Sequence, residues 1–338
     1  MKYQIIKTNV HVIGDEKYYC AIVHFDLKSP YILSFGTIDV FKTLYVIKEK
    51  DGVYGIGEVT ALPGYSPETI ENLWASLNDH LGGLSESPVC YGEGFCVAAL
   101  NTCLESFEQK LLYEDVEFSA KSVQFIDHPR DASIEVAKLK IGRSVSDDLN
   151  KVRKAQAFSY KLRMDANQGY GTTQAKNFLG NISPRNIEYV EQLIAKDRWH
   201  EMGRMAAEYP KLSFLLDESI CSIEDIDKAK HYGAANAIKL KLFKCGSMAN
   251  TLETAKYAMN QGFEVVLGNG VQTIVGAFYE AYCYNKLINY ANFNDYSEIN
   301  GPYKIKGFKN MKENIIKMKS KEIKKFVVKL LFDIRRMQ

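Results

Sequence analysis

The sequence lacks a strong net charge, a paired cysteine motif and a long apolar run. Its 43 Lys and Arg residues nearly balance its 41 Asp and Glu residues, for a net charge of +2, so no global basic field points to nucleic acid. The seven cysteines form no C-x-x-C pair, which argues against a zinc site or a disulfide framework and favours a reducing compartment. No apolar run approaches the length of a membrane span, and the start lacks the apolar core of a signal peptide. We therefore expect a cytoplasmic protein with no nucleic-acid or membrane partner.

The composition is that of a globular protein. The chain has 338 residues, of which 46% are hydrophobic and 25% are charged. A chain of this length can bury a sizeable core and is expected to form about two domains.

The first hundred residues predict an α+β domain, which we place at residues 1–108. Two segments, "YYCAIVHFDL" and "FKTLYVIKEKDGVYGIGEV", carry the β-branched and aromatic residues typical of strands, and the Asp51-Gly52 pair predicts a hairpin turn within the second segment. The sequence "SPETIENLWASLNDHL" then has helical periodicity, with a start signal at residues 66–68. A second helix is expected in "FCVAALNTCLESFEQKLL".

Strand-like runs alternate with helical stretches through the middle of the chain, which predicts a parallel sheet. The expected helices are Asp147–Ser159, Thr172–Gly180, Trp199–Glu208, Ile223–His231, Met248–Gln261 and Thr273–Lys286. The steps from Lys140 through Asp165, Glu191, Asp217 and Lys241 to Leu267 are 25, 26, 26, 24 and 26 residues. An open doubly wound sheet also alternates strand and helix, but even steps near the ~30 residues of a barrel unit favour a closed barrel.

Charged residues stand where these strands end. Asp165, Glu191 and Asp217 end three successive strands, and the neighbouring strands carry lysine pairs in "KLK" triplets. Residues two apart on a strand point to the same side, and chemistry in such barrels sits at the carboxyl ends of the strands. Three converging carboxylates repel one another unless a cation binds them, and hard oxygen ligands suit Mg²⁺. A lysine near another lysine and a divalent cation should have a depressed pKa and could act as a base.

Each of these residues also has a structural interpretation when taken alone. A lysine near a strand end is usually a surface residue whose stem packs on apolar neighbours. The segments "DAN" and "LDES" could form a turn or a helix cap. The joint pattern at near-constant spacing favours the functional interpretation.

The motifs "KLKIG", "LRMDANQGY", "YVEQLI", "LLDESI" and "LKLFKCGS", with "GIGEVTALPGYSPET" in the first domain, resemble the enolase superfamily in its muconate-lactonizing subgroup. The resemblance implies an α/β fold: a modified TIM barrel, (β/α)7β, under an N-terminal α+β capping domain. The barrel would span residues 109–301. The C-terminal segment, residues 302–338, would return to the cap. This segment is Lys-rich and amphipathic, so membrane or acidic-partner binding is the alternative.

The resemblance also implies an essential Mg²⁺ bound by Asp165, Glu191 and Asp217. Lys140 would be the base on one face of the substrate, and Lys138 would tune it. Alignment on the Cys-Gly end of "LKLFKCGS" makes Lys241 the opposite lysine. Whether Lys239 joins the site stays open, because the period of two places it on the same side.

The chemistry implied is removal of the proton beside a substrate carboxylate, giving an enolate. Reprotonation by the opposite lysine gives racemisation or epimerisation of an amino-acid or dipeptide derivative, which is the leading hypothesis. The alternatives are dehydration of the o-succinylbenzoate synthase kind, cycloisomerisation, and a catalytically silent binding protein of the same fold. We expect a small-molecule carboxylate as substrate and a homo-oligomeric assembly.

Three departures from the family pattern affect the substrate. Between "SVQFIDHP" and "EVAKLKI" there is no room for a crossover helix, so the first βα unit is truncated or its strand is misplaced. Gln272 stands where the family often has a glutamate. Glu298 and Asn300 replace the Asp-x-Asp that grips the ammonium group in dipeptide epimerases, or they only shape the final turn.

Two cap loops, Leu27–Thr37 and Ala61–Glu68, are expected to reach over the barrel mouth. Their apolar side chains could form a lid over the substrate, although lone aromatics are more often ordinary packing. These side chains are Tyr31, Phe35, Leu62 and Tyr65.

Overall fold

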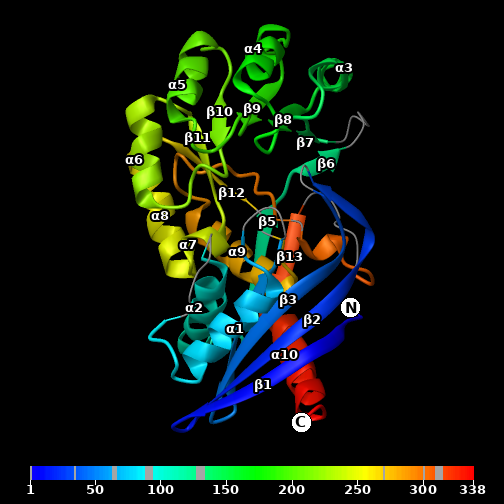
Figure 1. Cartoon of the computed structure of the whole chain (residues 1–338), viewed down its shortest axis with the longest axis vertical. Helices are drawn as coiled ribbons and strands as arrows, with labels where there is room; N and C mark the ends of the chain where they lie inside the picture. The colour runs from blue at the N-terminus through cyan, green and yellow to red at the C-terminus, as the bar shows by residue number, and fades with distance from the viewer. Residues whose placement is uncertain are drawn as a thin grey trace.

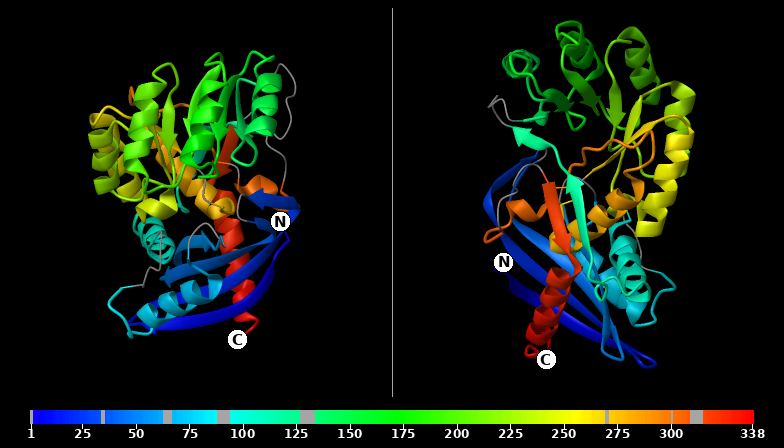
Figure 2. Two further views of the ribbon diagram at one scale, coloured as in Figure 1. Left: turned by 45° about the horizontal axis from the view of Figure 1, so that its top comes forward. Right: turned by 180° about the vertical axis from the view of Figure 1, so that it is seen from behind.

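The computed structural model describes residues 2–33, 36–62, 67–87, 94–126, 134–268, 271–299, 301–308 and 315–338. An antiparallel sheet lies at one end of the molecule and a ring of βα units lies at the other (Figure 1). Both chain termini lie at the end that carries the antiparallel sheet (Figures 1 and 2).

The antiparallel sheet has the strand order β1-β2-β3-β4, with bounds Gln4–Ile13, Glu16–Leu33, Gly36–Lys50 and Val53–Thr60. The predicted hairpin is confirmed: Asp51 and Gly52 both have positive φ, 50° and 74°, and join β3 to β4. The loop predicted at Leu27–Thr37 is wrong for most of its length. β2 continues to Leu33 and β3 begins at Gly36, because Tyr31 pairs with Ile38 across the hairpin.

Two helices, α1 (Ile70–Leu81) and α2 (Phe95–Glu108), pack on this sheet. The N-cap of α1 is Thr69, whose side chain accepts a hydrogen bond from the backbone N–H of Asn72, so the helix begins after the predicted start signal. Helix α2 lies so close to β4 that a Cβ on Gly57 would be 1.8 Å from the backbone oxygen of Ala99. Glycine at this position is therefore required by the approach of the helix.

Seven parallel strands form the second sheet, in the order β12-β11-β10-β9-β8-β7-β6. In chain order the strands are Gln124–Ile126, Val136–Lys140, Lys161–Asp165, Ile187–Glu191, Phe214–Leu216, Ala237–Leu240 and Glu264–Leu267. The helices between and after them are α3 to α9, with bounds Val145–Ala155, Thr172–Gly180, Trp199–Glu208, Ile223–Tyr232, Leu242–Cys245, Met248–Asn260 and Ile274–Leu287. The predicted alternation is confirmed, and all six predicted helices are present within a few residues of their expected bounds.

The sheet closes through the segment after α9. The backbone of this segment bridges Val265 of β12 on one side and Ser122 beside β6 on the other, through Phe293 and Ser297 respectively. Only residues 127–135 connect β6 to β7, which is too short for a crossover helix, and their described part, residues 134–135, is not helical. The seven strands and this closing segment therefore form a modified (β/α)7β barrel with a truncated first unit.

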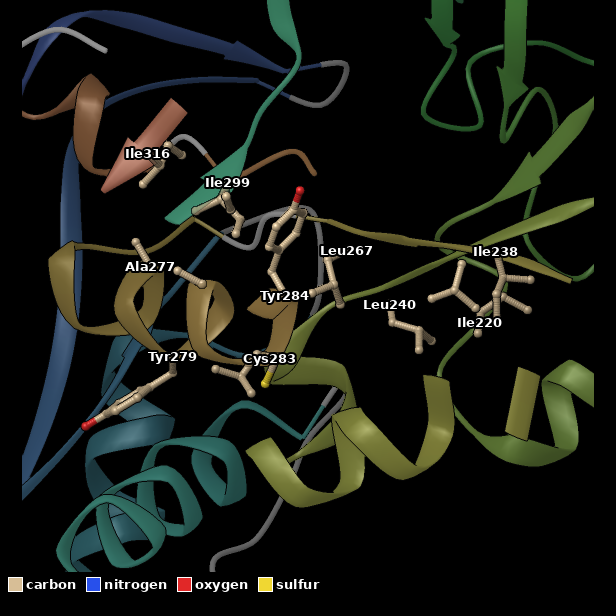
Figure 3. Close-up of a cluster of buried hydrophobic side chains, with 14 of the residues drawn as sticks. Ile220, Ile238, Leu240, Leu267, Ala277, Tyr279, Cys283, Tyr284, Ile299 and Ile316 are labelled. Atoms are coloured by element: carbon tan, nitrogen blue, oxygen red, sulfur yellow. The ribbon is translucent and has the colours of Figure 1, made fainter. Parts of the chain in front are cut away.

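A cluster of buried hydrophobic side chains extends from the cap and the C-terminal segment into the barrel, and part of it is drawn in Figure 3. Ile238, Leu240 and Leu267, from the adjacent strands β11 and β12, lie along one side of this cluster, and Cys283 and Tyr284 of α9 lie near Leu267 (Figure 3). Their burial fixes the relation of strands to helices and so the positions of the strand ends.

The C-terminal segment contains β13 (Ile315–Lys319), which pairs with β5 (Glu117–Lys121), and α10 (Ser320–Arg335). Helix α10 lies against the antiparallel sheet (Figure 2). Phe326 contacts the rings of Tyr3 and Tyr45, and Arg335 forms a 2.7 Å ion pair with Glu49. Among the described helices, none has both the length and the apolarity needed to cross a membrane.

Candidate active site

The predicted carboxylates lie side by side at the carboxyl end of the parallel sheet. Asp165 ends β8 and is the register partner of Glu191, which ends β9, while Asp217 directly follows β10. Lys140, at the end of β7, is in turn the register partner of Asp165. The parallel register thus converts the even sequence spacing into a row of charged side chains.

Lysine ammonium groups bridge this row. Lys138 Nζ lies 2.7 Å from Asp165 Oδ2, 2.7 Å from Glu191 Oε2 and 2.8 Å from Glu298 Oε2. Lys140 Nζ lies 2.6 Å from Asp165 Oδ2 at one end of the row, and Lys241 Nζ lies 2.8 Å from Asp217 Oδ2 at the other. Lys140 and Lys241 therefore flank the carboxylates from opposite ends.

Lys239 joins the same cluster. Its side chain is fully buried, donates hydrogen bonds to Glu191 and Glu298, and lies 3.8 Å from Asp217 Oδ2. Lys239 of β11 and Lys241, which directly follows this strand, thus both reach Asp217, as the period of two predicts. Gly268 makes room for this arrangement, since a Cβ there would lie 2.5 Å from Lys239 Cγ and Cδ.

The lysines hold most of the carboxylates in their charged form. Burial alone would raise the pKa of Asp165, but Lys138, Lys140 and Lys239 outweigh burial and hold that pKa well below its usual range. Burial likewise opposes the shift at Glu298, whose pKa is lowered to about 2 by Lys138, Lys239 and Arg163.

The pKa values of two glutamates in the cluster are raised instead of lowered. Burial, followed by the charge of Asp165, raises the pKa of Glu191 to about 8 despite Lys138 and Lys239. Burial, followed by the charge of Asp217, raises the pKa of Glu218.

The pKa values of Lys140 and Lys241 are raised, whereas the sequence predicts a lowered pKa for a lysine beside another lysine and a cation. Burial lowers the pKa of Lys140, and so does Lys138, but Asp165 outweighs them and the net shift is upward. The pKa of Lys241 is raised in the same way, mainly by Asp217 against burial. The pKa values rise because carboxylates, and not another lysine, are the closest charged partners of both side chains.

The carboxylate row has the chemistry of a site for a hard divalent cation. The ammonium group of Lys138 lies within ion-pair distance of oxygens of both Asp165 and Glu191. The ammonium group of Lys239 lies in the same way between Glu191 and Asp217. Carboxylate oxygens are the ligands that Mg²⁺ prefers. With the ammonium groups in these positions, no three His, Cys, Asp or Glu side chains of the described ranges converge on one point. A metal ion would need the same carboxylate oxygens that the lysines now contact. The carboxylates therefore fit the ion only if the ammonium groups of Lys138 and Lys239 move away from those oxygens.

Three supporting residues were not assigned a role from the sequence. Lys244 donates hydrogen bonds to the backbone and side-chain oxygens of Asp217, and Asn167 accepts a hydrogen bond from Lys140. Gln192 Oε1 accepts the backbone N–H of Asp217 and so orients that residue. Asn167 and Gln192 lie within two residues of a predicted carboxylate in the sequence, and this proximity was the only sequence feature that could have indicated their place in the site. Lys244 is brought back by the turn of α7.

The residues predicted to bind substrate lie in different parts of the structure. Glu298 is part of the lysine cluster. Burial would raise the pKa of the Tyr31 phenol on β2, but Lys304 first, and then Lys140, Lys241 and Lys138, outweigh burial and lower it.

Gln272 instead lines a cavity of about 30 Å³ between cap and barrel, with Glu58 and Phe243. Leu62 is buried. Tyr65, Asn300 and Phe35 lie outside the described residues, and so do residues 63–66 of the second predicted loop.

The fold and the site together define an α/β-barrel protein with a charged constellation at the strand ends, covered by an α+β cap. Residues 123–310 match the model of the enolase C-terminal domain-like family. The chain belongs to this family, and the predicted membership of the enolase superfamily is confirmed.

Two curated relatives that the chain resembles are named as a racemase and an epimerase. The chain is 24% identical over 297 residues to the N-succinyl-L-Arg/Lys racemase of Bacillus cereus, covering 75% of this chain and 79% of the relative. It is also 24% identical over 305 residues to the L-Lys-D/L-Arg epimerase of Desulforapulum autotrophicum, covering 76% and 83%.

Solved structures share the whole fold. The dipeptide epimerase from Cytophaga hutchinsonii, complexed with Mg and the dipeptide D-Ala-L-Val, aligns with a TM-score of 0.77 at 19% identity, covering 90% of this chain and 92% of that one. The muconate lactonizing enzyme from Pseudomonas fluorescens aligns with a TM-score of 0.73 at 22% identity, covering 88% and 90%. The predicted fold class, a barrel with a capping domain, is therefore confirmed.

Proposed function

We propose that this protein is a Mg²⁺-dependent isomerase that removes the proton beside a substrate carboxylate and racemises or epimerises an amino-acid or dipeptide derivative. The observation that carries the proposal is the row of Asp165, Glu191 and Asp217 with Lys140 at one end and Lys241 at the other. Two amines on opposite flanks of a bound anion are what inversion at carbon requires.

Charge balance supports a metal in this site. The cluster contains five lysines and five carboxyl groups, so potential positive and negative charges are equal in number there: Lys138, Lys140, Lys239, Lys241 and Lys244 against Asp165, Glu191, Asp217, Glu218 and Glu298. A substrate carboxylate brings one negative charge, and loss of its α-proton adds a second. Mg²⁺ held by Asp165, Glu191 and Asp217 would supply the two compensating positive charges.

The lysines would move the proton. The carboxylates raise the pKa of both flanking lysines, and a divalent cation bound to those carboxylates would act in the opposite direction and favour a neutral amine. That neutral amine takes the α-proton and becomes an ammonium group, while the C–H electron pair is delocalised into the substrate carboxylate. The ammonium group of the opposite lysine then protonates the other face and becomes neutral. Lys138 does not transfer the proton in this scheme. Its ammonium group, which lies 2.8 Å from Glu298 in addition to the two carboxylates that a metal would take, would add positive charge beside Lys140.

The named relatives favour racemisation or epimerisation over the other outcomes. The two curated relatives are a racemase and an epimerase of amino-acid compounds, whereas the muconate lactonizing enzyme among the similar structures keeps cycloisomerisation as the second candidate. A dehydratase of the o-succinylbenzoate synthase kind and a catalytically silent protein are outcomes of the test. The small-molecule substrate, the cytoplasmic location, the homo-oligomeric state and the domain boundaries at residues 108 and 301 remain predictions.

The test is α-proton exchange. The protein is incubated in D₂O with Mg²⁺ and panels of dipeptides, N-acylamino acids, muconate and o-succinylbenzoate precursors, and deuterium incorporation is followed by NMR. Exchange with inversion of an amino-acid derivative supports the proposal, and loss of exchange after chelation supports the metal. Lactone formation without inversion would instead identify a cycloisomerase, and dehydration without inversion would identify a dehydratase. No reaction with any compound would favour a binding protein.

A further inference from the structure

Two buried ammonium groups in the active site share one carboxylate oxygen. Lys138 Nζ and Lys239 Nζ each lie 2.8 Å from Glu298 Oε2. Both groups also contact the carboxylates that the proposed function assigns to the metal: Lys138 lies 2.7 Å from two of them, and Lys239 contacts two, the farther at 3.8 Å. Among the described residues, Glu298 is therefore the one ion-pair partner of both lysines that a metal ion would not take.

The closure of the barrel fixes the backbone of Glu298. Its N–H donates a 2.9 Å hydrogen bond to the carbonyl of Leu267 at the end of β12, and the preceding residue, Ser297, bridges to Ser122 beside β6. The side chain is 4% exposed, and its second carboxylate oxygen, Oε1, is buried without a hydrogen-bond partner in the described part of the chain. An ionised carboxylate has several acceptor positions on its two oxygens. Glu298 can therefore accept further hydrogen bonds from the two ammonium groups.

Glu298 carries a negative charge at neutral pH. Burial would raise its pKa, but Lys138, Lys239 and Arg163 outweigh burial and lower the pKa to about 2. The carboxylate is thus a stable counter-ion for both lysines.

The lysine stems are packed, whereas their ends can turn. Lys239 is fully buried, and a Cβ on Gly268 would lie 2.5 Å from its Cγ and Cδ. This contact fixes the first part of the stem, while the terminal bonds of the flexible four-carbon chain can still rotate. A rotation about these bonds would carry the ammonium group from the metal-binding carboxylates toward Glu298.

We propose that Glu298 is a positioning residue for the metal ion. It accepts the ammonium groups of Lys138 and Lys239 when they leave the three carboxylates of the row, and so makes those carboxylates available to Mg²⁺. The inference rests on the proposed function, because that function places Mg²⁺ on the row. Glu298 contacts neither metal nor substrate in this arrangement and acts only through the two lysines.

The affinity for Mg²⁺, measured by calorimetric titration without substrate, tests the proposal. Glu298→Gln leaves the two ammonium groups with no carboxylate except the metal ligands, so the Kd for Mg²⁺ should rise by about tenfold or more, the size of one charge-assisted hydrogen bond. Glu298→Asp keeps the charge and should restore most of the affinity. An unchanged Kd in Glu298→Gln would overturn the proposal.

The matched control is Glu264→Gln, which removes a carboxylate at the opposite end of β12. Glu264 accepts a 2.7 Å hydrogen bond from Asn294 there and contacts neither lysine. This variant should change the Kd by about twofold or less.

A general loss of negative charge would also weaken Mg²⁺ binding, so a double-mutant cycle separates the two explanations. Lys239→Met removes one of the ammonium groups that compete with the metal. In that background Glu298→Gln should raise the Kd by about threefold or less, because only Lys138 still needs Glu298. An equal effect of Glu298→Gln in both backgrounds would contradict the proposal, since a general field acts equally in both.

A crystal structure of the wild-type protein with Mg²⁺ decides the question if a variant fails to fold. Both ammonium groups should lie within about 3 Å of Glu298 and beyond about 4 Å from the metal-binding carboxylates. An ammonium group turned to another acceptor would refute the role of Glu298 while leaving the Mg²⁺ dependence intact. Absence of Mg²⁺ binding by the wild-type protein would instead refute the proposed function and this inference together.

Discussion

At the scale of single residues, the site is a network of buried ion pairs. Lys239 is fully buried and is held by Glu191 and Glu298, and Arg163, equally buried, forms a 2.6 Å pair with Glu188 deeper in the barrel. Taking charges out of water is costly, and the cost is recovered only when every partner is present. The barrel therefore depends on the complete set of charges.

Removing one member of this network should expose that dependence. Lys239→Met leaves Glu191 and Glu298 with one positive partner fewer, and we expect the free energy of unfolding to fall by about 3–5 kcal/mol. Adding Glu298→Gln should recover part of the loss, so the double-mutant cycle should give a coupling energy of about 1 kcal/mol or more. Denaturant unfolding measures both. Lys228→Ala, which removes an exposed pair with Asp225, is the control and should cost about 1 kcal/mol at most. Strict additivity would contradict the network.

The flanking lysines should separate chemistry from stability. Lys140→Ala removes the proposed base, so under the proposed function racemisation should fall by at least about a hundredfold. Its side chain is 39% exposed, and Asp165 keeps Lys138, so the unfolding free energy should change by about 1 kcal/mol or less. Polarimetry and thermal unfolding check the two statements. Lys241→Ala should also stop racemisation. Activity near wild type in either variant would refute the two-lysine assignment.

At the scale of elements, a buried glutamate links a cap strand to a barrel helix. Glu58 of β4 accepts hydrogen bonds from the backbone N–H of Thr273, at 2.6 Å, and from its hydroxyl, at the start of α9. Burial raises the pKa of Glu58 from 4.5 to about 7, although the hydrogen bonds from Thr273 act in the opposite direction. The folded protein thus holds the Glu58 proton more tightly than the unfolded chain does.

This shift predicts a pH-dependent stability. The contribution of Glu58 is fully present below about pH 4.5 and is lost as pH rises through about 7, and the shift corresponds to at most ~3 kcal/mol. Glu58→Gln keeps the hydrogen-bonding shape without the titration, so its unfolding free energy should fall less than that of wild type between pH 5 and pH 8. Chemical denaturation across this range measures the difference. Parallel pH profiles in the two proteins would show that Glu58 does not titrate there.

At the scale of the whole molecule, the chain begins and ends in the cap. Tyr3, near the start, donates a 2.6 Å hydrogen bond to Asp333 and packs edge-on against Phe326, both in α10. The barrel lies between these two segments in sequence, so their association joins the two ends of the chain within the cap.

The apolar face of α10 should carry this association. Phe326→Ala removes a buried ring between Tyr3 and Tyr45 and should lower the unfolding free energy by about 3–5 kcal/mol. Phe332→Ala, in the same helix but 59% exposed, is the matched control and should change it by about 0.5 kcal/mol or less. Denaturant unfolding of both variants tests the prediction. Equal effects would mean that α10 does not anchor the cap through this face.

The sequence by itself determined the alternation of strands and helices and the residues at the strand ends. Even spacing and the period of two were sufficient to predict that three carboxylates and two lysine pairs lie together, because parallel strands bring their carboxyl ends to one edge. The carboxylates are Asp165, Glu191 and Asp217. The resemblance carried by these motifs also identified the family.

Only the tertiary structure decided which charges meet. That Lys239 bridges Glu191 and Glu298, that carboxylates raise the lysine pKa values, and that Lys304 lies beside Tyr31 all depend on contacts between segments distant in sequence. Spacing along one strand fixes the direction of a side chain. It cannot fix the partner, because the distance to a charge on another element is set by how the barrel closes and how the cap docks on it.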